Sequence, residues 1–392
     1  MPTPHGFHRR SRGIILRMAG PPLAPTIDDL RRHALARSLF VPTDLPRALA
    51  HLGFVQADPI RAPARAQDLT LRHRVKGYLA GDLERRYPKL AIEEDFFVNY
   101  GFLTRELQAL MHPRTASAVW SPAHWKRAQE VLAFVRERGP THPREVDSHF
   151  RHGKVKNWFG GSSNASTLLL DGMHYRGLLR VARRDGGTRV YETAAPWEAP
   201  TDRATRQARM DALVDLAVAK YAPLTARGLS NLLSFLRAAV PQWEGDRARA
   251  LAAVKARMAH TRIEGVDWYW PATERPRRAP EADAGVRLLA PFDPVVWDRG
   301  RFEGFWGWAY RFEAYTPAPK RKMGYYAMPM LVGTQVVGWA TVALSDALLR
   351  CEAGLASGAR PGRALREGLQ RELFALATFL GAPQATLRQV WR

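Results

Sequence analysis

The sequence predicts an α+β protein, mainly α, in which tandem winged helix-turn-helix domains precede a C-terminal antiparallel β domain. Amphipathic helical segments recur in sets that each end in a short strand or hairpin. The clearest hairpin carries Asp185-Gly186-Gly187 between two strand-like runs. After about residue 281 the chain changes to aromatic, glycine-containing and strand-like segments. These three observations predict the fold class.

The chain is strongly basic, with 59 Lys and Arg against 37 Asp and Glu and a formal net charge of +22. At 392 residues and 46% hydrophobic content it can bury a substantial core in two or three domains. Such a positive field attracts phosphate backbones and speeds encounter with them. Ribosome association, an anionic lipid surface and the arginine bias of a GC-rich genome are the alternative explanations.

Cysteine and histidine usage excludes several kinds of site. Cys351 stands alone, so an internal disulfide and a multi-cysteine zinc or iron–sulfur site are excluded. Histidines are scattered singly, and phosphate-binding loop, zinc-helix and deaminase motifs are absent from the sequence. We therefore expect no metal and no cofactor. No apolar run approaches the roughly 20 residues of a membrane span, and a cytoplasmic location is expected.

Residues 1–24, rich in Pro and Arg, are expected to form a disordered basic tail, and residues 25–120 the first winged helix. Thr26 before Asp28-Asp29 is a plausible helix start. Pro46 opens a second helix, which leads straight into the strand that ends in Gln56-Ala57-Asp58.

Residues 121–200 are predicted to form the second winged helix. Helices at Trp125–Arg138 and about Ser166–Tyr175 precede the hairpin, whose strands carry four arginines. As a wing, this hairpin would touch a phosphate backbone through Arg183, Arg184 and Arg189. A solvated hairpin whose arginines only face water is the alternative.

Residues 201–280 are predicted to form a third winged helix and a linker. The helical set spans Gln207 to His260, Trp268-Tyr269-Trp270 closes it as a strand, and Pro271–Glu281 reads as the linker. Residues 281–392 are predicted to form the β domain, with a closing helix at about Arg363–Leu380.

The most informative motif is Gln56-Ala57-Asp58. In a strand, Gln56 and Asp58 project from the same face, so an amide and a carboxylate would stand side by side on a rigid element. A carboxylate in so cationic a chain suggests chemistry on a polyanion. The alternative is that Asp58, which precedes Pro59, only shapes a turn.

Two stretches of sequence resemble the YcaQ/AlkZ family of winged-helix DNA glycosylases, and the resemblance extends over roughly residues 26–344. The first is Gly53-Phe54-Val55-Gln56-Ala57-Asp58, which is similar to the Gln-x-Asp motif of the YcaQ branch. The second is a longer ordered string: Leu289-Ala290-Pro291-Phe292-Asp293, Trp297-Asp298-Arg299, Tyr310-Arg311-Phe312-Glu313, Tyr315-Thr316-Pro317-Ala318-Pro319-Lys320-Arg321-Lys322 and Gly324-Tyr325-Tyr326.

The resemblance implies a bacterial, nucleoid-associated enzyme that removes N7-alkylated purines from double-stranded DNA and accepts crosslinked bases. An N7-alkylated guanine leaves as a neutral base. Catalysis therefore has to stabilise the cationic sugar and to activate the attacking water. Asp58 would stabilise the cation and act as general base, and Gln56 would orient water or sugar. Because no Schiff-base lysine stands beside the motif, we expect a monofunctional enzyme. Protein partners are not indicated.

Five further cations are expected to meet DNA or to tune the site. We expect Arg61 or Arg65 to contact DNA and to lower the pKa of Asp58. Lys320-Arg321-Lys322 beside Tyr325-Tyr326 reads equally as a backbone clamp or a solvated loop. For Trp297-Asp298-Arg299 a structural ion pair under an aromatic core is favoured over a DNA contact.

One departure from the family keeps a second function open. Where the family often has Glu-x-Trp-x-His, this chain has Asp95-Phe96-Phe97-Val98-Asn99. Loss of the histidine is compatible with a different lesion preference or weak activity. The alternative function is a non-catalytic winged-helix DNA-binding protein, such as a transcriptional regulator. An RNA-binding protein or a nuclease has only the charge in its favour.

Overall fold

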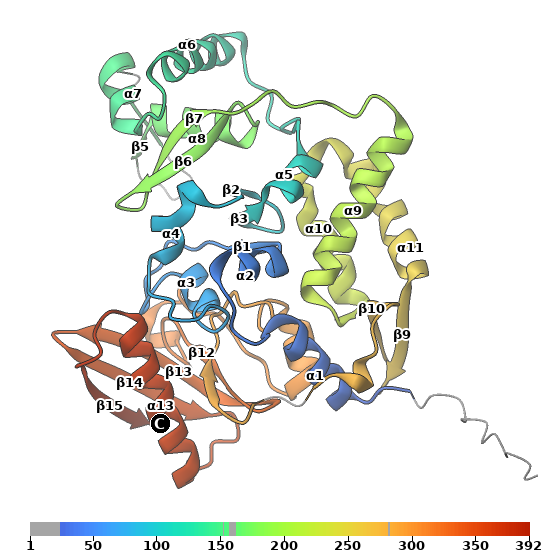
Figure 1. The fold of residues 1–392 in the computed structure, drawn as a ribbon, viewed down its shortest axis with the longest axis vertical. Coiled ribbons are helices and arrows are strands. Elements are labelled where there is room, and N and C mark those ends of the chain that lie inside the picture. Colours follow the sequence, from blue (N-terminus) through green and yellow to red (C-terminus); the bar gives the residue numbers. More distant parts are fainter. Residues whose placement is uncertain (1–23, 152, 157–161, 281–282) are drawn as a thin grey trace, which may run out of the picture.

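The computed structural model describes residues 24–151, 153–156, 162–280 and 283–392. The fold is a mixture of helices and small, mostly antiparallel sheets, arranged as a stack with the second unit at one end and the C-terminal β domain at the other (Figure 1). Residues 1–23, where a basic tail is expected, lie outside the described residues.

The first unit has helices flanking a three-stranded sheet. Its elements are α1 Ile27–Ser38, α2 Leu45–Leu52, β1 Phe54–Gln56, α3 Ala66–Leu71, α4 Asp82–Arg86, η1 Tyr87–Lys89, β2 Ile92–Phe96, β3 Tyr100–Thr104 and α5 Arg105–Met111. The strand order is β1-β3-β2, all antiparallel. Thr26 caps α1 with a reciprocal capping box to Asp29, so this helix begins where the sequence predicts.

The second unit confirms the predicted helices and hairpin. Its elements are α6 Pro122–Arg138, α7 Pro143–Phe150, β4 Lys154–Lys156, β5 Ser162–Asn164, α8 Ala165–Tyr175, β6 Leu179–Asp185 and β7 Thr188–Thr193. The β6–β7 hairpin turns through Gly186 and Gly187, both at positive φ. An isolated bridge joins Thr141 to Tyr191 of β7.

The third unit repeats the sheet of the first. Its elements are α9 Arg203–Tyr221, β8 Leu224–Thr225, α10 Ala226–Ala239, η2 Pro241–Asp246, α11 Arg247–Arg257, β9 Met258–Ile263 and β10 Val266–Pro271, with strand order β8-β10-β9. The predicted helical set is too long by a few residues, because β9 begins at Met258 and pairs along β10. The predicted linker folds as η3, Pro276–Arg278, against α1.

The C-terminal domain is a five-stranded sheet with two helices. Its elements are β11 Val286–Leu288, α12 Arg299–Trp306, η4 Ala318–Lys320, β12 Met328–Val332, β13 Gln335–Ser345, β14 Leu348–Leu355, α13 Arg363–Phe379 and β15 Thr386–Trp391. The expectation of an antiparallel domain is wrong at one edge, where β15 pairs parallel to β14. The closing helix α13 is the crossover that makes this pairing possible, since parallel neighbours need a long connection.

Buried ion pairing and aromatic packing join the units. Arg74 of the first unit contacts both carboxylate oxygens of Asp293 at 2.8 and 2.9 Å, with both side chains fully buried. Trp297 stacks on Tyr221 of the third unit with ring centroids 4.5 Å apart. Asp298 caps α12, and Arg299 donates to backbone carbonyls. The structural interpretation of this segment is therefore confirmed, without the expected ion pair.

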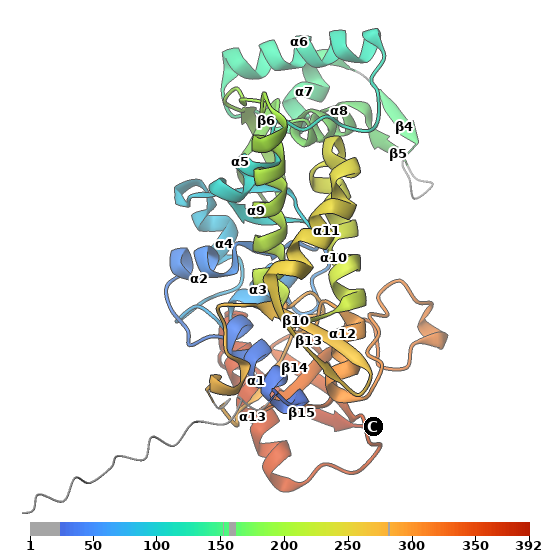
Figure 2. The same ribbon diagram turned by 90° about the vertical axis from the view of Figure 1, so that its right-hand side faces the viewer.

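Figure 2 shows that the loop after α12 and the β4–β5 hairpin project on the same side of the stack, with α10 between them. Helix α2 lies on the opposite side. The loop after α12 contains the predicted Lys320-Arg321-Lys322 segment.

Candidate active site

A cavity of about 680 Å³ lies where the first unit, the second unit and the C-terminal domain meet. The first unit contributes Gln56, Asp58, Arg65, Gln67, Asn99 and Tyr100 to its wall. The second unit contributes Pro143, Thr167, Asp171, Arg184, Thr188, Arg189 and Tyr191, and the C-terminal domain contributes Phe292, Phe312 and Tyr315. The volume lies in the range of small-molecule and cofactor sites.

Asp58 lies two residues beyond the end of β1, on the wall of this cavity. Its Oδ1 accepts a hydrogen bond from the backbone N–H of Ile60 at 2.9 Å. Its own N–H donates to the side-chain oxygen of Gln67 at 3.4 Å. Within the described residues its Oδ2 makes no hydrogen bond. These two hydrogen bonds fix the turn at Asp58, and Oδ2 remains available to a ligand.

Gln56 ends β1 and is only 6% exposed. Its neighbours Phe54 and Val55 pack into two different apolar clusters, which confirms the alternation expected of the strand. The side-chain Oε1 of Gln56 is buried and has no hydrogen-bond partner in the described residues. A buried acceptor without a partner is costly, and Gln56 is one of the residues that line the same cavity as Asp58.

Burial raises the pKa of Asp58, and the hydrogen bond from Ile60 offsets this only in part. The expectation that an arginine lowers this pKa is wrong. Arg65 forms an ion pair with Glu84 instead, and Arg61 is exposed. Gly187 at the tip of the hairpin lies against Arg65, where a Cβ would collide with the guanidinium. Because burial raises its pKa, the carboxylate of Asp58 is a stronger base than that of an ordinary aspartate.

The hairpin brings two of the predicted arginines to the cavity. Arg184 pairs with the fully buried Glu94 at 2.6 Å. Arg189 contacts Asp171 at 3.2 Å and lies over the Tyr100 ring, 5.0 Å from its centroid. Arg183 is exposed and does not line the cavity, and among the described residues its ion-pair partner is Asp185 alone.

The loop after α12 supplies an aromatic side chain beside the carboxylate. Tyr315 is 77% exposed and lines the cavity. Burial and the charge of Asp58 raise the pKa of Tyr315. The loop is held by Glu313, whose carboxylate accepts the backbone N–H groups of Lys322, Met323 and Gly324.

The basic segment belongs to the loop that carries Tyr315, but none of its three cations lines the Asp58 cavity. Lys320 and Lys322 are exposed. Arg321 is 4.9 Å from the Tyr325 ring centroid and donates to the carbonyl of Thr316. Tyr326, in contrast, is a core residue. The structure thus separates these residues into surface cations and packing groups.

In the segment Asp95–Asn99, which departs from the expected family pattern, Asp95 is buried and Asn99 lies on the cavity wall. Asn99 lies in the turn between β2 and β3, is exposed and lines the cavity. Asp95 is fully buried away from it, and its oxygens contact His112 at 2.7 Å and Arg114 at 2.8 Å. Burial alone would raise the pKa of Asp95, but Arg114 and His112 hold it far below its ordinary value.

The sequence reasoning did not single out Tyr100, Asp171, Tyr191 or Gln67 as site residues. Tyr100 directly follows Asn99, so its position beside the departure was the one available signal. Gln67 lies in α3 of the first unit, whereas Asp171 and Tyr191 come from α8 and β7 of the second unit, whose docking onto the first no local pattern indicates.

No group of three or more metal-binding side chains exists in the part of the chain that the structure describes. No helix among the described residues is long and apolar enough to cross a membrane.

Comparisons with known proteins identify the family and the fold of this chain. A family model described as DNA glycosylase AlkZ-like matches residues 49–379, a span that includes Gln56 and Asp58. Among solved structures, the chain is similar to the Streptomyces sahachiroi DNA glycosylase AlkZ, with a TM-score of 0.60 at 13% sequence identity. That match covers 94% of this chain and 100% of the other, and at this identity it shows a shared fold.

Proposed function

Because the chain belongs to the AlkZ-like family of DNA glycosylases, we propose that it hydrolyses the N-glycosidic bond of N7-alkylated purines in double-stranded DNA. The observation that carries this proposal is the junction cavity, which is lined by both Asp58 and Gln56. Among the described residues the Oδ2 of Asp58 is free, and the buried Oε1 of Gln56 has no hydrogen-bond partner. Crosslinked purines, which carry the same N7 linkage, are included as substrates.

The two oxygens suit the activation of water. A water molecule that donates one hydrogen to Asp58 and the other to Gln56 presents its lone pair to the anomeric carbon. Asp58 accepts the proton as the new C–O bond forms, and the alkylated purine departs with the glycosidic electron pair as a neutral base. The raised pKa of Asp58 makes the carboxylate a better acceptor of this proton.

The same carboxylate stabilises the sugar as it becomes cationic. At about 4 Å and an effective dielectric of about 20, an opposite-charge contact is worth roughly 4 kcal/mol. When it is felt mainly in the transition state, this corresponds to roughly a thousandfold in rate. Partial burial of Asp58 favours the interaction because less water screens it.

The aromatic side chains that line the cavity are suited to binding the alkylated purine. Phe292, Phe312 and Tyr315 approach from the C-terminal domain, and Tyr100 from the first unit. A cationic purine is attracted to aromatic faces, and stacking of a base on an aromatic ring contributes about 1–3 kcal/mol. Tyr315 is the most exposed of the four and is proposed to stack on the lesion.

The DNA duplex is proposed to lie along the side from which the loop after α12 and the β4–β5 hairpin project (Figure 2). The first three units are proposed to be winged helices, because each combines helices with a terminal hairpin, and the first and third share one strand order. Arg61, Arg183, Lys320 and Lys322 are the exposed cations proposed to meet phosphates, with Arg321 beside them. Arg65, Arg184 and Arg189 are proposed to shape the cavity.

The absence of lysine among the residues lining the Asp58 cavity, all of them in the described chain, supports a monofunctional reaction. The product would be an abasic site in an uncut strand, formed without metal or cofactor. A cleaved strand, together with a covalent protein–DNA complex that borohydride traps by reducing a Schiff base, would contradict this.

The test is base release from N7-methylguanine duplex and from a crosslinked duplex, with wild type and Asp58→Asn compared side by side. We expect Asp58→Asn to lose roughly a thousandfold in single-turnover rate while duplex affinity is retained. Absence of base release by the wild type, combined with preference for one DNA sequence, would favour a non-catalytic regulator instead.

A further inference from the structure

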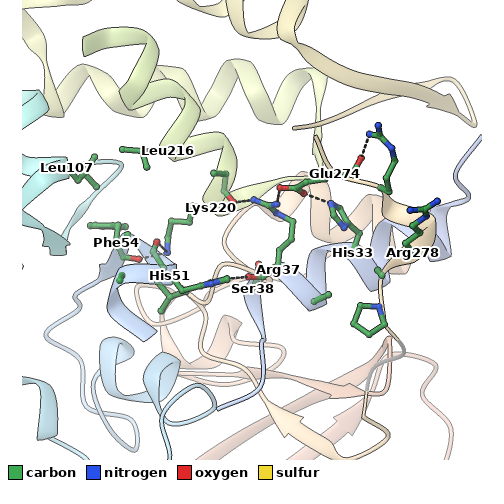
Figure 3. A pocket seen from close by; sticks show the side chains of 18 of the residues that line it. His33, Arg37, Ser38, His51, Phe54, Leu107, Leu216, Lys220, Glu274 and Arg278 are labelled. Carbon is green, nitrogen blue, oxygen red and sulfur yellow. Dashed lines mark hydrogen bonds and ion pairs between the residues drawn. The ribbon is translucent and has the colours of Figure 1, made fainter. Parts of the chain in front are cut away.

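Strand β1 contributes residues to two cavities. Its last residue, Gln56, lines the Asp58 cavity. Its first residue, Phe54, and the preceding Gly53 line a second cavity, of about 520 Å³, to which α1, α2, α9 and the η3 segment also contribute (Figure 3). The two cavities share no lining residue. A group in the second cavity can therefore act on the start of this short strand without entering the first.

The backbone at the start of β1 has an open edge. The strand lies at the edge of its sheet, beside β3. Towards β3, the carbonyl of Gly53 accepts from the N–H of Thr104 at 3.1 Å, and the N–H of Ala57 donates to the carbonyl of Tyr100 at 3.0 Å. Because backbone groups alternate in direction along a strand, the carbonyl of Phe54 faces away from β3. It needs a donor from another element.

Lys220, in the last turn of α9, supplies that donor. Its ammonium donates to the carbonyl of Phe54 and, at 3.3 Å, to that of Leu52, and Figure 3 shows its side chain beside Phe54. Leu52 ends α2, so its carbonyl is one of the four that a helix leaves without an internal partner. A cation is a favourable partner at that end of a helix. One side chain of the third unit thus binds both carbonyls where α2 passes into β1.

The contact lies in apolar surroundings. Phe54 and Tyr221, the neighbour of Lys220, belong to the same apolar cluster, and the Lys220 ammonium is 5.7 Å from the centroid of the Phe54 ring. Within the described residues no carboxylate contacts this ammonium. Burial lowers the pKa of Lys220 to about 7, with Arg74 acting in the same direction and Asp293 opposing it. The hydrogen bonds to the two carbonyls offset part of this cost of burial.

We propose that Lys220 is a positioning residue for the reaction at Asp58, and that it acts by fixing the start of β1. The inference rests on the proposed base release. Gln56 lies two residues beyond Phe54 and Asp58 lies four, so a shift of the bound carbonyl moves both side chains within their cavity. A displacement of about 1 Å can cost roughly a hundredfold in rate. Lys220 does not line the Asp58 cavity, so its effect passes through the strand.

The test compares Lys220→Met with Lys220→Arg in single-turnover base release from N7-methylguanine duplex, below the melting temperature of each variant. Methionine keeps an unbranched apolar stem and removes the ammonium, whereas arginine retains a charged donor for the two carbonyls. We expect Lys220→Met to lose roughly a hundredfold in rate with nearly unchanged duplex affinity, and Lys220→Arg to retain most of the rate. A wild-type rate in folded Lys220→Met, or equal losses in the two variants, would overturn the proposal.

Arg249→Gln is the matched control. Arg249 of α11 pairs with Asp211 of α9 at 3.3 Å and lines neither cavity. Lys220→Met and Arg249→Gln each remove one positive charge and one contact of α9, so both should reduce the attraction for duplex alike. Base release should slow in Lys220→Met alone. An equal loss in Arg249→Gln would mean that the rate follows the stability of the third unit, which would overturn the proposal.

Amide hydrogen exchange measures the effect on β1 without reference to base release. The N–H groups of Ala57 and Thr104, which bond between the β1 segment and β3, should exchange faster in Lys220→Met than in the wild type or in Arg249→Gln. Faster exchange with an unchanged rate, or slower base release with unchanged exchange, would overturn the positioning role. Absence of base release by the wild type would refute the proposed function, whereas exchange would still decide whether Lys220 fixes β1.

Discussion

Arg184 and Glu94 form a two-point ion pair, with Nε and Nη2 of the arginine 2.7 and 2.6 Å from the two carboxylate oxygens. The pair joins the hairpin of the second unit to β2 of the first. Arg180 makes a similar contact to Glu93, at 2.6 Å. Arginines that the sequence suggests for DNA thus also fix the hairpin over the Asp58 cavity.

Glu94→Gln is expected to lower the free energy of unfolding by about 3 kcal/mol, because it leaves the Arg184 charge with a neutral partner in a buried site. Urea denaturation measures the effect. The matched control is Arg183→Gln, one residue from Arg184 but exposed, which is expected to change stability by no more than about 0.5 kcal/mol. Similar losses in the two variants would refute the docking role of Arg184.

Asp58→Asn is expected to stabilise the protein at neutral pH. Because burial raises the pKa of Asp58, the folded chain binds more protons than the unfolded chain between the two pKa values. Stability therefore falls as pH rises through that window, and the asparagine removes this cost. The variant's gain in melting temperature should shrink as pH is lowered towards about 4.

Base release by the wild type should fall on acidification with an apparent pKa above that of an ordinary aspartate, because only the ionised carboxylate accepts a proton. Single-turnover rates across pH measure this. A pH-independent rate, with duplex binding unchanged, would remove Asp58 from the role of base.

Asp95→Asn is expected to destabilise the fold by about 3–5 kcal/mol, because it leaves the buried Arg114 without its carboxylate. The pKa of Asp95 is held below its unfolded value, so its contribution is complete above that unfolded value and is lost as pH falls through the folded value. Thermal unfolding of variant and wild type at pH 7 tests this. Rates measured below the melting temperature should be nearly unchanged, since Asp95 does not line the cavity.

Asn99→His places on the cavity wall the histidine that the resemblance leads us to expect at this position. Since Asn99 is exposed, unfolding should change by less than about 0.5 kcal/mol. We expect a changed ratio of rates on N7-methylguanine and crosslinked duplex, measured under single-turnover conditions. An unchanged ratio would mean that this position does not set lesion preference. Arg85→His, at an exposed site outside the cavity, is the control substitution.

Most elements could be predicted because their signals are local. The cap at Thr26, the glycine turn at Gly186 and the apolar spacing of α13 each specify an element without reference to distant residues. The strand β15 could not be predicted in this way, because its parallel pairing depends on a helix-long crossover. Asp58 could be identified from the motif, whereas its raised pKa depends on burial that other units create.

The sequence by itself determined the family, the strand that ends at Gln56 shortly before Asp58, and the basic character of the chain, since these reside in residue type and short-range order. Only the tertiary structure decided that Arg65 and Arg184 neutralise Glu84 and Glu94, that Tyr315 stands beside Asp58, and that a second cationic cavity forms around Lys220. Those outcomes depend on which charges become neighbours and lose water when separate units pack, and chain order does not encode that locally.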